Sequence, residues 1–169
     1  LATFGPVIPV IVLERVEHAV PLARALVAGG VRVLEVTLRT KAALACMEAI
    51  AREVPEAIVG AGTLRSADDV HAAKKAGCQF GVSPGYTQDI AQTCRAVGLP
   101  LLPGVATASE VMQANADGLS FLKFFPATAA GGTLAAPALA LAQTTSFRFQ
   151  STWPAKDIFH EYAQDFAKK

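Results

Sequence analysis

A lysine lies in the middle of a short aromatic run at residues 121–127, which reads Phe-Leu-Lys-Phe-Phe-Pro-Ala. A run of this length and composition predicts a buried strand, on which Phe121 and Phe125 would share a face with Lys123. Desolvation among aromatic rings favours the neutral amine, a nucleophile that forms Schiff bases with carbonyl compounds. The alternative is that Lys123 ends the strand and extends its ammonium group into water.

A second set of polar residues alternates within residues 34–40, where Glu35, Thr37 and Arg39 occupy every other position. On a strand they would face the same side. A glutamate buried in a strand is costly unless it is paired or used. It could serve as a structural partner of Arg39, or it could move protons while the guanidinium binds a substrate carboxylate with two hydrogen bonds.

Glycine and proline cluster after several apolar segments, as Gly-Ala-Gly-Thr at 60–63, Ser-Pro-Gly at 83–85 and Pro-Gly at 103–104. Each is a tight turn when taken alone. Together they would let a ligand approach the backbone, with the Thr63 hydroxyl beside it. A lysine, a glutamate and an arginine around such a site suit a 2-keto acid. The amine would condense with the keto group, and the resulting iminium would accept electrons from the neighbouring carbon–carbon bond.

These residues must be positioned by elements that alternate along the chain with a period of roughly 20–25 residues, which is typical of parallel crossover units. The expected strands are residues 7–13, 31–38, 57–63, 78–83, 101–106, 121–127 and 147–150. The expected helices are residues 17–27, 41–52, 66–76, 87–96, 109–116, 134–142 and 156–166. The strands are apolar nearly throughout, and no nucleotide-binding glycine motif follows the first. This favours an α/β fold of the closed (β/α)₈ TIM-barrel type over an open sheet, with functional groups at the carboxyl ends of the strands.

The predicted organisation is a single barrel domain over residues 1–169 in which part of the seventh and eighth units is lacking. Barrels of this kind rarely fit below about 200 residues. The alternation of predicted strands and helices stops after Gln150, and a new segment begins directly with Ser151. We therefore expect a gap at 150–151, either a deletion or residues missing from the chain.

Composition excludes several classes of function. The chain has 15 Lys+Arg against 14 Asp+Glu and a net charge of +1. This balance argues against nucleic-acid binding and membrane-surface binding. The cysteines and histidines are scattered, so we expect neither disulfides nor a metal site, and a reducing cytoplasmic location. No apolar run is long enough to span a membrane, and residues 1–9 lack the basic start of a signal peptide.

Six short motifs taken together resemble one enzyme family. They lie at residues 5–10, 34–39, 59–63, 83–85, 103–104 and 123–127. In this order they are similar to the 2-keto-3-deoxy-6-phosphogluconate (KDPG) aldolases, also described as 4-hydroxy-2-oxoglutarate aldolases. The resemblance implies a class I aldolase of the Entner–Doudoroff pathway that is a cytoplasmic homotrimer. It would cleave KDPG to pyruvate and glyceraldehyde 3-phosphate without a metal or organic cofactor.

The resemblance also implies a role for each motif residue. Lys123 would be the Schiff-base lysine and Glu35 the general acid and base. The substrate-binding residues would be Arg39 and Thr63 at the pyruvate carboxylate, Phe125 over the imine, Pro84 in the pocket wall and Ser151 at the phosphate end. Two alternatives stay open. One is a related pyruvate aldolase whose acceptor is glyoxylate, as in 4-hydroxy-2-oxoglutarate cleavage, or which acts on 2-keto-3-deoxy-6-phosphogalactonate. The other is a non-catalytic metabolite-binding barrel.

Overall fold

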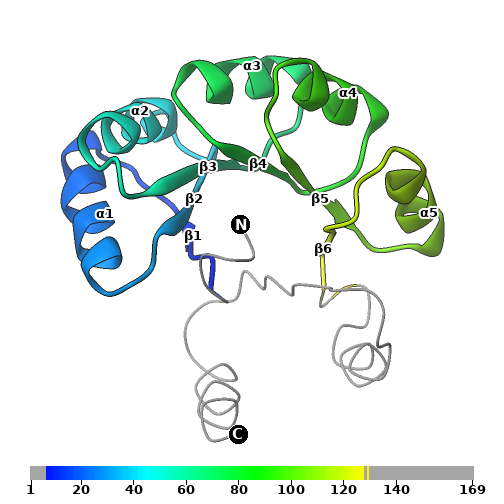
Figure 1. Ribbon diagram of the computed structural model, residues 1–169, viewed down its shortest axis with the longest axis horizontal. Helices are drawn as coiled ribbons and strands as arrows, with labels where there is room; N and C mark the ends of the chain where they lie inside the picture. The colour runs from blue at the N-terminus through cyan, green and yellow to red at the C-terminus, as the bar shows by residue number, and fades with distance from the viewer. Residues whose placement is uncertain (1–6, 128, 130–169) are drawn as a thin grey trace, which may run out of the picture.

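The computed structural model describes residues 7–127 and 129, and in this part of the chain six strands form one parallel sheet in sequence order. The sheet curls, and the helices cover its convex side (Figure 1). The strands are β1 (Val10–Ile11), β2 (Val33–Thr37), β3 (Ile58–Gly62), β4 (Phe80–Ser83), β5 (Leu101–Val105) and β6 (Lys123–Phe124). The helices are η2 (Val16–His18), α1 (Ala19–Ala28), α2 (Ala43–Glu53), α3 (Ala67–Lys75), α4 (Gln88–Ala96) and α5 (Ala108–Ala116). This is the predicted α/β class, a half-barrel of alternating strand and helix units.

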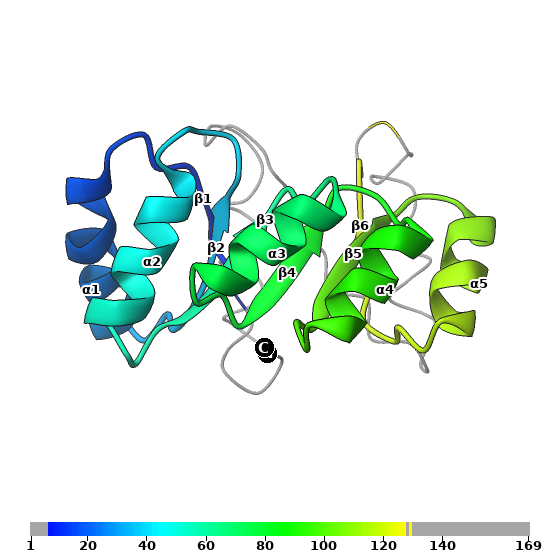
Figure 2. The same cartoon turned by 90° about the horizontal axis from the view of Figure 1, so that it is seen from above.

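The helices follow one another along the outside of the sheet in chain order (Figure 2). Three of them begin at a hydroxyl side chain that accepts a hydrogen bond from the first helical turn: Ser66 for α3, Thr87 for α4 and Thr107 for α5. Such caps satisfy amide groups that have no partner within the helix. The start of the helix expected at residues 66–76 is therefore confirmed.

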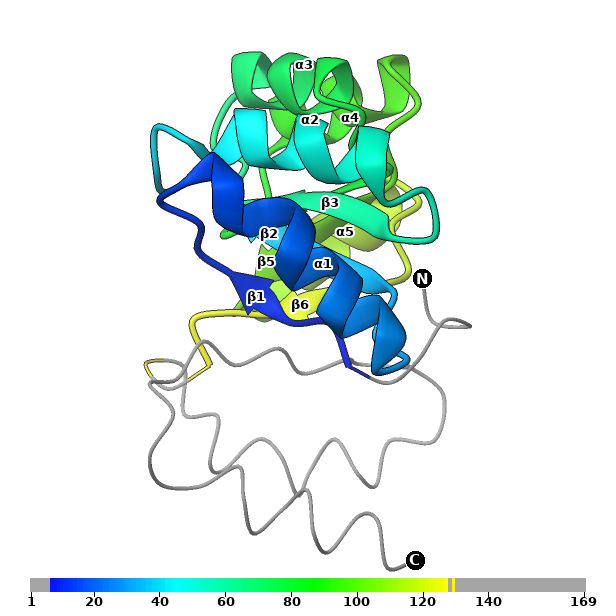
Figure 3. The ribbon, with the colours of Figure 1, turned by 90° about the vertical axis from the view of Figure 1, so that its left-hand side faces the viewer.

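Two apolar layers lie on the two sides of the sheet. The outer layer packs strand residues such as Leu34 and Val59 against helix residues such as Met47 and Ile50. Figure 3 shows the helices as a layer outside the strands. The inner layer is a smaller cluster that includes Phe80. All five residues of β2 are buried because both faces of this strand are covered, which explains its nearly continuous apolar sequence.

The strand predicted at residues 121–127 is shorter than expected. Parallel pairing to β5 joins only Gly104 with Lys123 and Val105 with Phe124. Phe121 precedes the strand and is 50% exposed, so the prediction that its ring shares the face of Lys123 is wrong. Residue alternation holds only within a paired strand, and this one begins at the lysine.

The first strand is likewise short, because β1 occupies only two of the seven residues at 7–13. The helix expected at 134–142, the strand at 147–150, the helix at 156–166 and the join at 150–151 lie outside the described residues. Within residues 7–127 and 129, no helix has the length and apolar character needed to cross a membrane.

The three cysteines are free and buried. Burial raises the pKa of Cys78 to about 12 and that of Cys94 to about 11, and it is also the main cause of the raised pKa of Cys46. Because the thiolate is the reactive form, we expect iodoacetamide to leave all three unmodified in the folded protein and to alkylate all three in denaturant. Mass spectrometry gives the count, and rapid alkylation of the folded protein would contradict this placement.

Cys78 should also make stability depend on pH. A folded thiol that keeps its proton while the unfolded thiol has lost it lowers the free energy of unfolding as pH rises. For Cys78 this loss runs from the ordinary pKa of 9.0 up to about 12. Cys78→Ala should show a smaller loss across the same range in denaturant titrations, and an equal loss would show that this thiol does not titrate as described.

Candidate active site

Lys123 and Glu35 approach each other inside the curl of the sheet. Lys123 is 4% exposed and Glu35 is 1% exposed, and the Lys123 Nζ lies 3.9 Å from the Glu35 Oε1. They come from β6 and β2, with three strands between them, so the curl of the sheet is what brings them together. The alternative in which Lys123 extends into water is therefore wrong, and Glu35 has an ion-pair partner in Lys123.

One aromatic ring lies close to the lysine of this pair. The Lys123 Nζ lies 5.0 Å from the centre of the Phe125 ring, within the range of a cation–π contact. The amide of Phe125 donates to the Val105 carbonyl at 3.1 Å, which holds that residue against the end of β5. Phe80 and Val82 form part of the inner apolar cluster. Phe125 follows β6 and is not part of the paired strand, but its ring lies beside the lysine, as the prediction of a shared face required.

Burial is the largest influence on Lys123 and lowers the pKa of its ammonium group below the ordinary 10.5. The Glu35 carboxylate opposes this shift, and the Arg39 guanidinium adds to it. A lowered pKa increases the fraction of neutral amine near neutral pH, and the neutral amine is the nucleophilic form. The surroundings of Lys123 therefore favour the neutral, nucleophilic form of its amine.

The distance between Nζ and Oε1 has a chemical consequence. At 3.9 Å the two groups attract each other but are too far apart for a direct hydrogen bond. A small oxygen atom between them, from water or from a substrate hydroxyl, could exchange a proton with the carboxylate while it lies beside the amine.

Arg39 lies two residues beyond the end of β2, so the strand alternation used to predict its direction does not reach it. Its side chain is exposed, while its charge still acts on Lys123. The β2 end itself is fixed by two hydroxyl groups. Thr37 donates to the Ile11 carbonyl at 3.2 Å, and Thr40 donates to the Leu13 carbonyl at 2.5 Å. Arg39 therefore stands on an anchored segment at the rim of the site.

Thr63 follows β3 directly and has a backbone φ of 66°. This left-handed conformation is unfavourable for a β-branched residue, and such strain is concentrated at functional sites. The sequence prediction identified the Thr63 hydroxyl but gave no sign of this strain. Thr63 is partly exposed, at the same carboxyl edge of the sheet as Arg39.

The Pro-Gly pair at 103–104, predicted as a strand-end turn, lies inside β5. A Cβ atom added to Gly104 would meet the Pro84 carbonyl oxygen at 2.2 Å, so the β4–α4 loop crosses directly over this glycine. Gly104 in turn pairs with Lys123 in the sheet. The absence of a side chain at Gly104 thus lets the partly buried Pro84 approach the lysine strand, a role that a turn assignment could not reveal.

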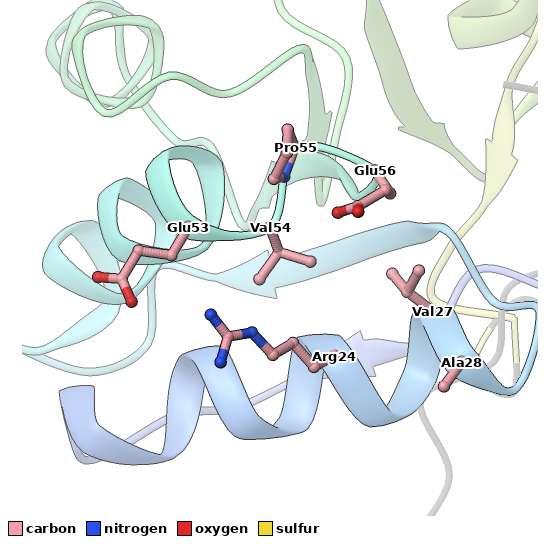
Figure 4. A pocket seen from close by; sticks show the side chains of 7 residues that line it. All are labelled: Arg24, Val27, Ala28, Glu53, Val54, Pro55 and Glu56. Atoms are coloured by element: carbon pink, nitrogen blue, oxygen red, sulfur yellow. The ribbon is translucent and has the colours of Figure 1, made fainter.

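Ser151 lies outside the described residues. A surface hollow of about 390 Å³ lies elsewhere, between the end of α1 and the segment after α2 (Figure 4). Its lining comprises Arg24, Val27, Ala28, Glu53, Val54, Pro55 and Glu56, and none of the predicted site residues is among them. Within the described residues, no group of three or more His, Cys, Asp or Glu side chains could hold a metal ion.

The family model for "KDPG and KHG aldolase" matches residues 2–153. The "KHG/KDPG aldolase" of Escherichia coli (strain K12) is 53% identical over 140 residues, which are 83% of this chain and 66% of that protein. The chain thus spans slightly less than two thirds of the length of this relative.

Solved structures of the same family are also similar to this chain. The 2-keto-3-deoxy-6-phosphogluconate aldolase of Zymomonas mobilis ZM4, with 3-phosphoglycerate, matches with a TM-score of 0.81 and 45% identity over 89% of this chain and 72% of that one. The KDPG aldolase from Legionella pneumophila, with pyruvate captured at low pH as a covalent carbinolamine intermediate, matches with a TM-score of 0.81 and 40% identity, covering 94% of this chain and 77% of that one. By its sequence, its sheet and its motif residues, the chain belongs to the KDPG and KHG aldolase family.

Proposed function

We propose that this protein is a class I aldolase that cleaves 2-keto-3-deoxy-6-phosphogluconate to pyruvate and glyceraldehyde 3-phosphate. The observation that carries the proposal is the buried Lys123 amine 3.9 Å from the Glu35 carboxylate. Schiff-base chemistry needs at least a nucleophilic amine and a neighbouring group that transfers protons. The pyruvate carbinolamine in the Legionella pneumophila relative supports the same substrate class.

The proposed reaction begins when the neutral Lys123 amine attacks the keto carbon of the substrate to form a carbinolamine. Glu35 in its protonated form gives a proton to the departing hydroxyl group, so water leaves and the iminium forms. The Glu35 carboxylate then takes the proton of the substrate C4 hydroxyl. The C3–C4 bond breaks, its electrons move to the iminium nitrogen as an enamine, and the aldehyde leaves. Protonation at C3 and hydrolysis by water release pyruvate and restore the amine.

The other motif residues would bind and orient the substrate. Arg39, at the rim of the site, would bind the carboxylate next to the keto group, and the Thr63 hydroxyl would donate to the same end. Phe125 would shield the imine from water, and Pro84 would line the pocket. Ser151 would bind at the phosphate end. No metal or organic cofactor is required by this chemistry.

We further propose a cytoplasmic homotrimer, as the family resemblance implies. Sedimentation that gives the mass of a single chain would contradict the trimer. A related pyruvate aldolase that uses glyoxylate, or that acts on the phosphogalactonate analogue, would have the same lysine and glutamate. Cleavage rates compared across the three substrates distinguish these enzymes, and a barrel without catalytic activity would cleave none.

Lys123 is expected to form the covalent imine. Pyruvate with borohydride should leave one reduced adduct on Lys123, as peptide mapping would show. Because burial lowers the pKa of this amine, trapping should rise with pH to a plateau whose midpoint lies below 10.5. An adduct on the surface lysines Lys74 or Lys75 instead, or a midpoint at 10.5, would contradict the assignment.

Arg39→Lys should weaken substrate binding. Lysine keeps the charge but cannot make the two parallel hydrogen bonds of a guanidinium. We expect KM to rise roughly tenfold, the usual worth of one charged hydrogen bond, with the melting temperature unchanged. Arg52→Lys on the outer surface is the matched control and should leave KM as it is. An unaltered KM in the Arg39 variant would place the carboxylate elsewhere.

Glu35→Gln should separate proton transfer from structure. Glutamine keeps the size and hydrogen bonding of the side chain but cannot shuttle a proton. We expect a folded protein that still binds pyruvate and loses roughly 10²–10⁴-fold in kcat, the usual contribution of positioned acid–base catalysis. Glu53→Gln on the surface is the control. A folded Glu35→Gln protein of nearly full activity would end the proposal that this carboxylate does the chemistry.

A further inference from the structure

The inner face of β3 carries two glycines, Gly60 and Gly62, at alternate positions that point into the curl of the sheet. In the sheet, Gly60 pairs with Glu35 on one side and with Phe80 on the other. The positive-φ glycines of the described residues are Gly30, Gly77, Gly98 and Gly118, so neither β3 glycine is required for backbone conformation. Another reason must account for the missing side chains.

The space at each position is taken by a different neighbour. A Cβ atom at Gly60 would lie 2.1 Å from the Phe80 ring, which is a packing contact of the inner apolar cluster. A Cβ atom at Gly62 would lie 2.3 Å from the Glu35 Oε1 and within 2.9 Å of its Cγ and Cδ. The Glu35 backbone therefore pairs with Gly60, and its side chain extends along β3 so that the carboxylate lies over Gly62.

We propose that Gly62 is a positioning residue whose missing side chain provides the space that holds the Glu35 carboxylate at its distance from the Lys123 amine. Ordinary van der Waals contact begins at about 3.4 Å, so an alanine here would displace the carboxylate by about 1 Å. A displacement of this size at a reacting group can cost about 10²-fold in rate. The catalytic consequence rests on the proposed function, whereas the placement of the carboxylate does not.

The first test measures the placement without using the proposed activity. Competitive acylation of the folded protein, read by mass spectrometry against pH, gives the midpoint of Lys123 titration. Among the described residues, the charged groups that act on Lys123 are Glu35 and Arg39, so a displaced Glu35 carboxylate must change that midpoint. We expect Gly62→Ala to shift it by about half a pH unit, the value for a 1 Å change near 4 Å at an effective dielectric constant of 20.

Gly81→Ala is the matched control. Its Cβ atom would overlap the Leu64 Cδ1 at 2.4 Å, a conflict of similar size that lies in an apolar contact without the Glu35 carboxylate. The Gly81 variant should keep the wild-type Lys123 midpoint even where it lowers stability. An unchanged midpoint in Gly62→Ala, or an equal shift in both variants, would overturn the proposal.

The second test is a double-mutant cycle on turnover. Gly62→Ala should lower kcat about 10²-fold with little change in KM, because the change affects proton transfer more than substrate binding. Glu35→Asp shortens the side chain by one methylene and leaves room for the alanine methyl group. In that background Gly62→Ala should therefore cost only a few-fold in kcat, and an equal cost in both backgrounds would overturn the proposal.

Folding provides a third readout where Gly62→Ala alone proves unstable. Combining it with Glu35→Ala removes the side chain with which the methyl group collides, so the double variant should fold. A double variant that stays unfolded would overturn the proposal. If the wild-type protein cleaves no 2-keto acid, the proposed function fails while the acylation result still decides the placement. If it is active and the Gly62 readouts do not move, only this inference fails.

Discussion

The structure depends on one costly arrangement, a lysine and a glutamate that share a nearly dry interior. Each charge alone would be expensive to bury, and the two partly compensate each other across 3.9 Å. Burial lowers the pKa of Lys123, and the Glu35 carboxylate, which makes no direct hydrogen bond to the amine, offsets only part of this effect. A closer pair would be more stable and less reactive, because a tightly paired ammonium group is not a nucleophile.

The surrounding elements can be understood as support for this arrangement. Phe80 and Val82 belong to the inner apolar cluster, and the Phe125 ring lies beside the amine. Three glycines allow close approach at points where a side chain would block it: Gly60 under the Phe80 ring, Gly62 under the Glu35 carboxylate and Gly104 under the Pro84 carbonyl. Apolar side chains thus set the dielectric of the site, while glycines set its dimensions.

Much of this could be predicted from the sequence because the informative residues violate a local pattern. A lysine and a glutamate inside apolar strand segments stand out, and the alternation of strand and helix was regular enough to give the fold. What could not be predicted depends on tertiary pairing. The exposure of Phe121 follows from where β6 begins to pair with β5, and the location of Pro103-Gly104 inside β5 follows from its pairing with β4. The contact of Glu35 with Lys123 requires the curl of the whole sheet, which no local window contains.

The order of the strands has a consequence for how the chain folds. Every pairing in the described sheet joins strands that are neighbours in sequence, so each pairing spans only one strand–helix–strand unit. The contact between Glu35 and Lys123 is different, because it spans 88 positions and depends on the four pairings from β2 to β6. A chain can therefore hold most of its helices and strands while these two side chains are still far apart. Recovery of a reactive lysine is consequently a stricter measure of native structure than recovery of secondary structure.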